Sequence, residues 1–406
     1  MTVRFQNDGL IASFNPQRAA ASLLFVLFTS RIIYEICTKS EILRIANSIR
    51  VDGFDSDVET LRKNEQVSNF SEFLSWAPIR DDIQLFSYAN VLTDGLCASI
   101  ESAILAGWTY QLIGPTIILP KFGPPLHPKF DKDFALSVIL NVLPKNVTIV
   151  FADAFDVLYQ RSFDEFRKAV FETEYLNGHI VFASEDNCWP FNRSNRKTYS
   201  CPLMQGKNWY PGSPDQSLGC KLQVDLYDKY LSKGGTGDKA DAVRSIYLNS
   251  GLSLGVVGNY SHLIRSALQM TKEYSRLCLD DQGLSAWLMV RGKEIPISLD
   301  YQSVLFGTYG VDKLIFDSKA GLIKVRDSGR QAQLNISDLV APYMIHFNGG
   351  GKPYFNRTRD QLIEFRSRKQ AIFELLEKKT FYIDGIEKKF TKECDTYVNR
   401  HYLGAK

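Results

Sequence analysis

Apolar and polar residues follow one another along the chain from about residue 82 in a pattern that predicts strands and helices in turn. A strand-like run begins at Ile83. The apolar residues within 96–104 recur at four-residue spacing, which predicts a helix with Thr93 at its N-cap and Gly107 just after its end. A strand followed by a helix therefore opens the folded part.

The same alternation continues through the middle of the chain. Strands are predicted at 108–113 and 116–119, and a helix is predicted at 134–143, immediately before Pro144. Strands that alternate with helices are typical of parallel sheets. We therefore expect an α/β fold with a mostly parallel central sheet.

Two short, continuous apolar runs have acidic residues directly after them. TIVF at 148–151 and HIVFAS at 179–184 have the composition of strands buried on both faces. Asp153 and Asp156 follow the first run, and Glu185 follows the second. Because ligands of open α/β sheets bind outside the carboxyl ends of the strands, these acids lie where a site is expected.

Asp153 and Asp156 are three positions apart in the segment FADAFDVLY. In a turn, this spacing can point two carboxylates into one cleft, where they repel each other unless a proton or a cation intervenes. Mg²⁺ and Mn²⁺ prefer oxygen ligands and are often held by carboxylates together with substrate phosphates. The other interpretation is the first turn of a helix, where acidic residues are common.

His346 lies in PYMIHFNGGGKP, where a strand of buried character is followed by three glycines. A histidine at a strand end can complete a metal site, and the glycines permit a close approach to a phosphate, which Lys352 could then meet. A lone histidine can equally be a core residue whose ring nitrogens are satisfied.

Two further acidic segments are candidates for contacts with a sugar. Asp280 and Asp281, in CLDDQGL, could cap a helix, bind sugar hydroxyls or serve as a base. Glu185 and Trp189, in ASEDNCWP, pair an acid with an aromatic surface, which suits the polar edge and the apolar face of a sugar. A tryptophan in a core is the usual alternative.

The N-terminal segment has the composition of a targeting signal. Residues 19–28 form an apolar run that is too short to span a bilayer alone, and apolar character resumes after Arg31. No A-x-A cleavage site follows, which favours a signal anchor within 1–40 over a cleaved signal peptide. A buried amphipathic helix is the third interpretation. Residues 41–80 then form a stem. We expect a single-pass type II membrane protein facing the lumen of the endoplasmic reticulum or Golgi.

Sequons and cysteines are consistent with that compartment. Six N-x-S/T sequons occur, at Asn69, Asn146, Asn192, Asn259, Asn335 and Asn356. The seven cysteines form no C-x-x-C pair, so disulfides are expected instead of a zinc or redox motif. If Cys37 belongs to the anchor, the nearest plausible pair is Cys201 with Cys220. Cys97 lies in a helical pattern and could instead be a buried thiol.

Charge and composition add three expectations, about partners, a long loop and the C-terminal segment. The formal net charge of +3 gives no field for a polyanion, so nucleic acid is not expected as a partner. Residues 191–243 are rich in Asn, Ser, Gly, Pro and Lys, which predicts a long loop over the site. From Thr358 the pattern is helical, which predicts a C-terminal helical extension over 357–406.

Six segments, in this order, resemble the glycosyltransferase domain of procollagen lysyl hydroxylases and, more distantly, the collagen galactosyltransferases. They are FADAFDVLY, VFASEDNCWP, YLNSGLSLG, DDQ, SLD and HFNGGGK, and the resemblance spans 82–353. It implies a GT-A type nucleotide-sugar-binding domain, placed at 81–356, that uses UDP-glucose or UDP-galactose with Mn²⁺ or another divalent cation. Two features differ: the H-G-N-G of the family is H-F-N-G here, and 191–243 is longer than its counterpart.

The resemblance also implies roles for the residues at matching positions. The metal ligands would be Asp153, Asp156 and His346. The donor contacts would be Asn348, Gly349 and Lys352 at the diphosphate, together with Ser87, Asn249 and Trp189. The catalytic acids, on the side of the sugar and the acceptor, would be Asp281, Asp280 and Glu185.

The expected function is metal-dependent transfer of glucose or galactose from a UDP-sugar to a luminal protein acceptor. The expected acceptor is hydroxylysine or galactosyl-hydroxylysine of a collagen-like protein. Because about 50 residues follow Pro353, we expect sugar transfer without a hydroxylase domain. The alternatives are a catalytically inactive, chaperone-like protein that binds sugar or collagen on the same fold, and a nucleotidyltransferase.

Overall fold

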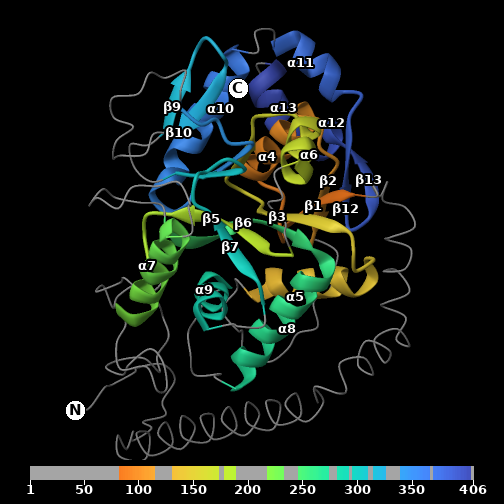
Figure 1. The fold of residues 1–406 in the computed structure, drawn as a ribbon. Coiled ribbons are helices and arrows are strands. Elements are labelled where there is room, and N and C mark those ends of the chain that lie inside the picture. Colours follow the sequence, from red (N-terminus) through yellow and green to blue (C-terminus); the bar gives the residue numbers. More distant parts are fainter. Residues whose placement is uncertain are drawn as a thin grey trace, which may run out of the picture. The chain divides into compact units, whose positions relative to one another are not determined.

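The computed structural model describes residues 82–114, 130–172, 178–188, 217–232, 246–273, 281–291, 295–309, 314–325, 339–365 and 369–403, and Figure 1 draws them in colour. All of these residues belong to one compact unit. Within them, no helix combines the length and apolar character needed to cross a bilayer. The predicted anchor and stem lie outside the described residues.

The centre of the fold is an eight-stranded sheet with the order β13-β12-β2-β1-β3-β6-β5-β7. Its strands are β1 Ile83–Tyr88, β2 Tyr110–Ile113, β3 Thr148–Asp153, β5 Ile180–Glu185, β6 Tyr247–Val256, β7 Ile297–Asp300, β12 Thr380–Ile383 and β13 Ile386–Lys389. Neighbours pair in parallel from β12 through β3 and again between β5 and β7, whereas β6 and β13 run antiparallel to their neighbours. The predicted α/β fold with a mostly parallel central sheet is confirmed.

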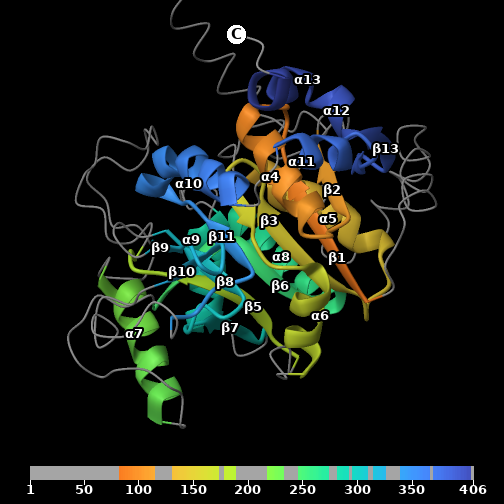
Figure 2. The ribbon, with the colours of Figure 1, turned by 90° about the horizontal axis from the view of Figure 1, so that it is seen from above.

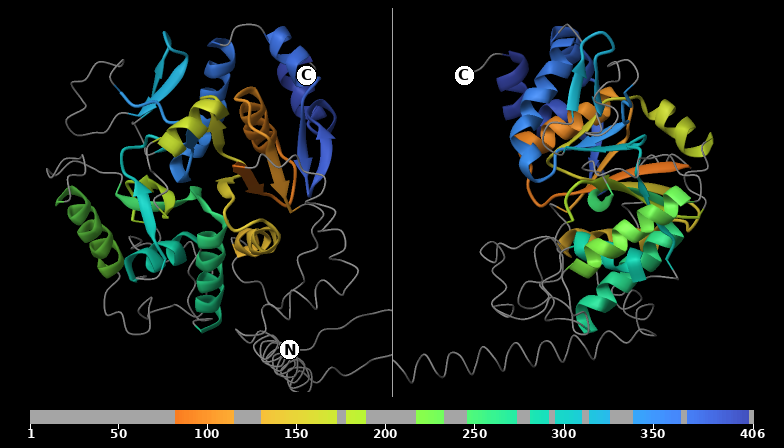
Figure 3. Two further views of the ribbon diagram at one scale, coloured as in Figure 1. Left: turned by 45° about the vertical axis from the view of Figure 1, so that its right-hand side comes forward. Right: turned by 60° about the vertical axis from the view of Figure 1, so that its left-hand side comes forward.

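Helices cover both faces of this sheet. Successive residues of a strand point to opposite faces, and in the central strands both sets are apolar and buried. In β3, Val150 and Ala152 contribute to one core, and Ile149 and Phe151 to the other. The first core is covered by α4 Asp94–Leu105, α6 Phe163–Glu172, α10 Lys352–Phe365 and α11 Lys369–Leu376. The second core is covered by α5 Phe130–Val142, α8 Val257–Glu273 and α9 Asp281–Arg291. Figures 1 and 3 show the two helical layers on opposite sides of the strands.

A second, three-stranded sheet lies beside the central sheet and has the order β4-β11-β8. Its strands are β4 Val157–Tyr159, β8 Phe306–Thr308 and β11 Met344–His346. The hydroxyl of Thr308 donates to the backbone carbonyl of Ser184 at 2.6 Å, which joins β8 to β5. A separate hairpin is formed by β9 Leu314–Asp317 and β10 Leu322–Val325. Figure 2 shows β8 and β11 close to β5 and β6.

Several predicted elements have the expected type with shifted ends. The Thr93 hydroxyl accepts a hydrogen bond from the Leu96 amide at 3.2 Å, which confirms the predicted cap of α4, and Gly107 follows the helix with φ at +83°. The helix predicted at 134–143 begins at Phe130. The strand predicted at 108–113 begins at Tyr110, and 116–119 lie outside the described residues.

The predicted long loop at 191–243 is wrong for its second half, which contains α7 Ser217–Ser232. Cys220, Gln223 and Tyr227 recur at helical spacing on the face that packs inward. Cys220 forms a disulfide with Cys188, so the predicted Cys201–Cys220 pair is also wrong. Cys188, just after β5, and Cys220, on α7, are brought together by the fold, and spacing along the chain did not reveal this.

A helical extension was predicted for 357–406, but the C-terminal segment also contains two strands. After α10 and α11, β12 and β13 extend the central sheet beyond β2, because β12 pairs in parallel with β2. The short helices α12 Phe390–Glu393 and α13 Asp395–Val398 and a π-helical turn Asn399–Leu403 follow. The domain boundary proposed at 356 falls inside α10.

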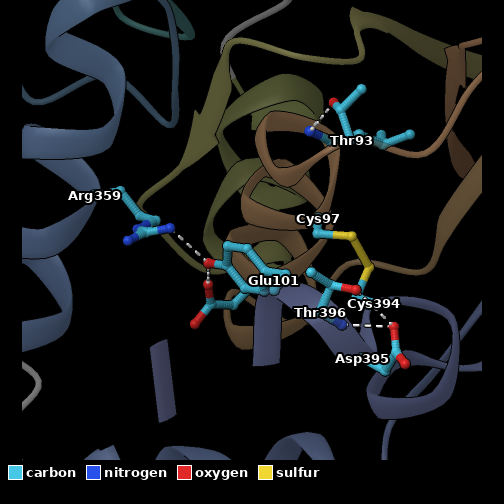
Figure 4. The surroundings of a disulfide bond; sticks show 9 residues. Thr93, Cys97, Glu101, Arg359, Cys394, Asp395 and Thr396 are labelled. Carbon is cyan, nitrogen blue, oxygen red and sulfur yellow. Dashed lines mark hydrogen bonds between the residues drawn. A yellow bond between two sulfur atoms is a disulfide. The ribbon is translucent and has the colours of Figure 1, made fainter. Parts of the chain in front are cut away.

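A disulfide joins this C-terminal segment to α4. Cys97 is bonded to Cys394, so Cys97 is not a free thiol (Figure 4). Beside it, Arg359 donates to the Tyr397 hydroxyl at 3.0 Å, and that hydroxyl donates to the buried carboxylate of Glu101. The covalent bond and the buried hydrogen bonds together hold the last described helices against α4.

Candidate functional site

Three predicted metal ligands meet beside the carboxyl end of β3. Asp153 is the last residue of β3, a bend over 154–156 follows, and Asp156 directly precedes β4. His346 ends β11, which pairs with β4 so that His346 is opposite Val157. One ligand atom from each of Asp153, Asp156 and His346 lies within 4.8 Å of the others. The D-x-x-D spacing therefore marks a turn between strands and not the start of a helix.

The imidazole of His346 is directed between the two carboxylates. Its Nε2 lies 3.5 Å from Oδ2 of Asp153 and 3.4 Å from Oδ1 of Asp156. Asp156 and His346 are buried, with exposed fractions of 5% and 4%, whereas Asp153 is partly exposed. The cluster is therefore open to solvent mainly on the Asp153 side.

The opposite nitrogen of the same ring is held by Asn249. Nδ1 of His346 lies 2.9 Å from Oδ1 of Asn249, and the backbone amide of Gly251 donates to that same oxygen at 3.0 Å. Because this oxygen can only accept, Nδ1 must carry the proton of the neutral ring. Nε2 then presents its lone pair to the two carboxylates, an arrangement that needs a cation or a further proton.

Gly251 makes room for the imidazole on β6. A Cβ atom at this position would lie 2.1 Å from Cε1 of His346, far inside van der Waals contact. The ring thus lies directly on the glycine backbone. Any side chain at position 251 would move the imidazole.

The electrostatics of the cluster follow from burial and close opposite charges. Burial raises the pKa of Asp156, but His346 and Lys352 outweigh it and lower this pKa to about 2. Burial lowers the pKa of His346, but the carboxylates of Asp156, Asp153 and Glu185 outweigh it and raise this pKa above its usual value. In the absence of a metal, a proton on His346 therefore supplies part of the positive charge that faces the two aspartates.

Two lysines contact the aspartates from opposite sides. Lys352, at the start of α10, has its Nζ 3.1 Å from Oδ2 of Asp156, and 65% of its side chain is exposed. Lys132, on α5, is largely buried, and its Nζ lies 3.0 Å from Oδ1 of Asp153. The cluster thus has one exposed cation and one largely buried cation.

Asp281 adjoins the cluster through the buried lysine. It is the first residue of α9, is 3% exposed, and has its Oδ2 2.5 Å from Nζ of Lys132. The hydroxyl of Ser250, on β6, donates to the same oxygen. Asp281 is therefore held by Lys132 and Ser250 next to the metal-ligand candidates.

Glu185 lies at the end of β5, on the other side of His346. Gln282 and Asn348 each donate a side-chain amide hydrogen to its carboxylate. Burial raises the pKa of Glu185 to about 7, although the amide of Gln282, the charge of His346 and the amide of Asn249 oppose the shift. A carboxyl group with this pKa can exchange a proton near neutral pH, as a general base or acid must.

The side-chain oxygen of Asn348 lies near Glu185 and has no hydrogen-bond partner among the described residues. Its amide nitrogen donates to Glu185, and its Oδ1 is buried. A flipped amide would bring Oδ1 against the carboxylate, so the orientation is fixed. The available atom is an acceptor, which fits a sugar hydroxyl better than the diphosphate oxygens that the sequence suggested for this side chain.

The remaining predicted residues are placed as follows. Gly349 has a φ of +49° at the start of the turn Gly349–Gly351. Ser87 is fully buried in β1 beside the phenols of Tyr110 and Tyr159, and its proposed donor contact stays a prediction. Asp280 and Trp189 lie outside the described residues.

The SLD segment has a structural explanation. Asp300, at the end of β7, accepts hydrogen bonds from the backbone amides of Val304, Leu305 and Phe306, at distances from 2.7 to 3.1 Å. Burial raises the pKa of Asp300 to about 6, against the effect of these amides. Asp300 thus shapes the turn that leads into β8 and aligns β8 with β11.

Sequence reasoning missed four residues of the site: Lys132, Ser250, Gly251 and Gln282. Three of them lie inside quoted segments, YLNSGLSLG and DDQ, whose other members were assigned. Lys132 lies far from every quoted segment, and an isolated lysine in the first turn of a helix has no distinguishing signal.

No protein-family model matches the sequence, and no curated protein matches it. Among solved structures, the chain is similar to the galactosyltransferase LgtC, which was solved in complex with donor and acceptor sugar analogs. The alignment has 11% identity and a TM-score of 0.35, and it covers 72% of this chain and 99% of that chain. A likeness of this degree carries no argument about activity, so the functional case rests on the site itself.

Proposed function

We propose that this chain is a metal-dependent glycosyltransferase that moves glucose or galactose from a UDP-sugar to an acceptor. The observation that carries this proposal is the cluster of Asp153, Asp156 and His346, in which Nε2 of an imidazole faces two carboxylates. Such a donor set suits Mn²⁺ or another hard divalent cation of the kind that accompanies diphosphates.

The residues of the cluster fit such an ion. Two carboxylates and one imidazole supply oxygen and nitrogen ligands, and each ligand lies at or next to a strand end fixed by backbone pairing. When bound, the ion would offset the charge that develops on the departing diphosphate. The protein's part is to hold Asp156 and His346 buried and oriented before the donor arrives.

Lys352 is the proposed contact to the diphosphate. Its side chain is mostly exposed, so it can turn from Asp156 toward a phosphate oxygen. Gly349 and the two glycines after it let the backbone approach the donor closely. Together they form the phosphate side of the proposed site.

Glu185 and Asp281 are the proposed acids on the sugar and acceptor side. Glu185 can take the proton of the acceptor hydroxyl as the new glycosidic bond forms and UDP leaves, because its pKa lies near neutrality. Asp281 forms an ion pair with Lys132 and is proposed to stabilise positive charge at the anomeric carbon. Asn348 Oδ1 can accept a hydrogen bond from a sugar hydroxyl.

The acceptor in this proposal is hydroxylysine or galactosyl-hydroxylysine of a collagen-like protein, reached in the lumen of the endoplasmic reticulum or Golgi by a chain anchored through 1–40. The resemblance of six sequence segments supports the acceptor class. The Cys97–Cys394 and Cys188–Cys220 disulfides support an oxidising compartment. The sequon residues Asn146 and Asn356 are exposed, as glycosylation requires.

The test is to incubate the purified protein with UDP-glucose or UDP-galactose, with and without Mn²⁺, and with peptides carrying hydroxylysine or galactosyl-hydroxylysine. We expect Mn²⁺-dependent release of UDP with one donor and one peptide. If UDP binds but no sugar is transferred to either peptide, the proposal is wrong and the inactive, sugar-binding alternative is favoured. If only nucleoside triphosphates react, the chain is a nucleotidyltransferase.

A further inference from the structure

Asn249 touches both halves of the proposed site. It lies on β6, is 2% exposed, and is paired with Ala183 of β5 in the central sheet. Its Oδ1 faces Nδ1 of His346 at 2.9 Å, and its amide nitrogen donates to the carboxylate of Glu185. One side chain therefore contacts a metal-ligand candidate and a candidate base.

The orientation of this amide is fixed at both ends. The backbone N–H of Gly251 donates to Oδ1 at 3.0 Å, and the carboxylate of Glu185 requires a donor on the other side. A flip would bring oxygen against the carboxylate and nitrogen against the Gly251 N–H, so both contacts would become repulsive. The polar atoms of Asn249 are thus engaged by protein groups.

We infer that Asn249 is a positioning residue that fixes the Nδ1–H tautomer of His346 with its oxygen and the direction of the Glu185 carboxylate with its nitrogen. The metal part of this inference rests on the proposed function. A histidine ligand is commonly oriented by a hydrogen bond from its second ring nitrogen, and loss of that partner typically weakens metal binding about 10–100-fold. The same amide would align the metal-ligand histidine and the base relative to each other.

Two substitutions separate the two halves of the amide. Asn249→Asp keeps an oxygen that can accept from Gly251 and His346, but it replaces the donor to Glu185 by a second carboxylate. Asn249→Leu removes both functions at similar size. Gln111→Leu is the matched control, because Gln111 is a buried amide of the same sheet that bonds Gln84 and lies apart from the cluster.

The first readout is calorimetric Mn²⁺ affinity in the presence of UDP, set against turnover at saturating Mn²⁺. Asn249→Asp should keep Mn²⁺ affinity within about 3-fold of wild type while turnover falls about 10–100-fold. Asn249→Leu should lose about 10–100-fold in both affinity and turnover. Gln111→Leu should lower thermal stability only. The inference is wrong if the Asp and Leu variants lose Mn²⁺ affinity equally.

The second readout needs no metal. Two-bond ¹H–¹⁵N correlation spectra of ¹⁵N-histidine-labelled protein, recorded at a pH where His346 is neutral, report its tautomer, and His346→Gln identifies its signals. Wild type and Asn249→Asp should show the Nδ1–H form, and Asn249→Leu should show the Nε2–H form. An unchanged tautomer in Asn249→Leu overturns the inference. A wild type that shows the Nδ1–H form but binds no Mn²⁺ refutes the proposed function and leaves the positioning role intact.

Discussion

Nζ of Lys132 lies 2.5 Å from Oδ2 of Asp281, so an ammonium group from α5 contacts the first residue of α9. Burial lowers the pKa of Lys132, but Asp153 and Asp281 outweigh it and raise this pKa above its usual range. Lys132 is thus a permanent internal cation that two acids of different proposed roles share.

Replacement of this cation should have opposite effects on stability and on metal binding. Lys132→Met leaves the buried carboxylate of Asp281 without its ion pair, which should cost about 3–5 kcal/mol of unfolding free energy. The same change removes a positive charge next to Asp153, so Mn²⁺ should bind more tightly. Denaturant unfolding without metal and a calorimetric Mn²⁺ titration measure the two effects. Lys132→Arg keeps the charge and serves as control; weaker Mn²⁺ binding by Lys132→Met would contradict this account.

Glu185 should make the stability of the metal-free protein depend on pH. Its pKa is raised from 4.5 to about 7 in the folded protein, so between these values the folded state binds a proton that the unfolded state has lost. Stability must then fall as pH rises through this window, by up to about 3 kcal/mol in total. The measurement is denaturant unfolding from pH 4 to 8.

Glu185→Gln is the reference for that measurement, because it removes the titrating group and keeps the shape. Asp300 also titrates near pH 6, and subtraction of the variant from wild type removes its contribution. The difference in unfolding free energy should decline from about pH 4.5 to 7 and then become constant. A difference that is constant throughout, or that increases with pH, would show that Glu185 is ionised in the folded protein at lower pH.

Gly251→Ala should damage the metal site through the imidazole. The new methyl group would lie 2.1 Å from Cε1 of His346, so the ring must leave its place between the aspartates. We expect Mn²⁺ affinity to fall at least about 10-fold, together with a loss of stability. Gly258→Ala is the control, because its nearest non-neighbouring atom would be at 3.4 Å. Normal Mn²⁺ affinity in Gly251→Ala would mean that His346 is not a ligand.

The Cys97–Cys394 disulfide should stabilise the fold without serving the site. It closes a segment of 297 residues between α4 and the C-terminal helices, and loss of such a bond typically costs about 2–5 kcal/mol. The double variant Cys97→Ala/Cys394→Ala should therefore unfold at lower denaturant concentration while its Mn²⁺ and UDP affinities at low temperature stay unchanged. Loss of UDP affinity in a folded double variant would show that the C-terminal segment shapes the site.

The sequence revealed those parts of the site that local chemistry marks. Two carboxylates after a buried strand, an acid after the next, and a histidine before glycines carry a visible signal, and the structure brings Asp153, Asp156 and His346 together. Lys132 and the contact between Asn249 and His346 were missed because they depend on which atoms of distant elements meet. Asn249, for example, reaches this position because β6 runs antiparallel between β3 and β5 in the sheet.

The fold, like the site, was predictable where a local sequence pattern marks an element. Apolar runs of four to six residues identified β3 and β5, and periodicity identified α4. The helix α7 was missed because glycine, proline and asparagine surround it, and β12 was missed because it pairs with a strand about 270 residues earlier. Long-range pairing leaves no periodic trace in a short strand.

The most direct test of the central claim is calorimetric titration of UDP into the protein in Mn²⁺ buffer and again in EDTA, for wild type, Asp156→Asn and Asp281→Asn. If Asp153, Asp156 and His346 hold the cation through which the diphosphate is bound, wild type should bind UDP only with Mn²⁺ and Asp156→Asn should lose this binding. Asp281→Asn should bind UDP nearly as wild type does while its sugar transfer falls about 10²–10⁴-fold. UDP binding that is equal with Mn²⁺ and EDTA, or that survives in Asp156→Asn, would contradict the account.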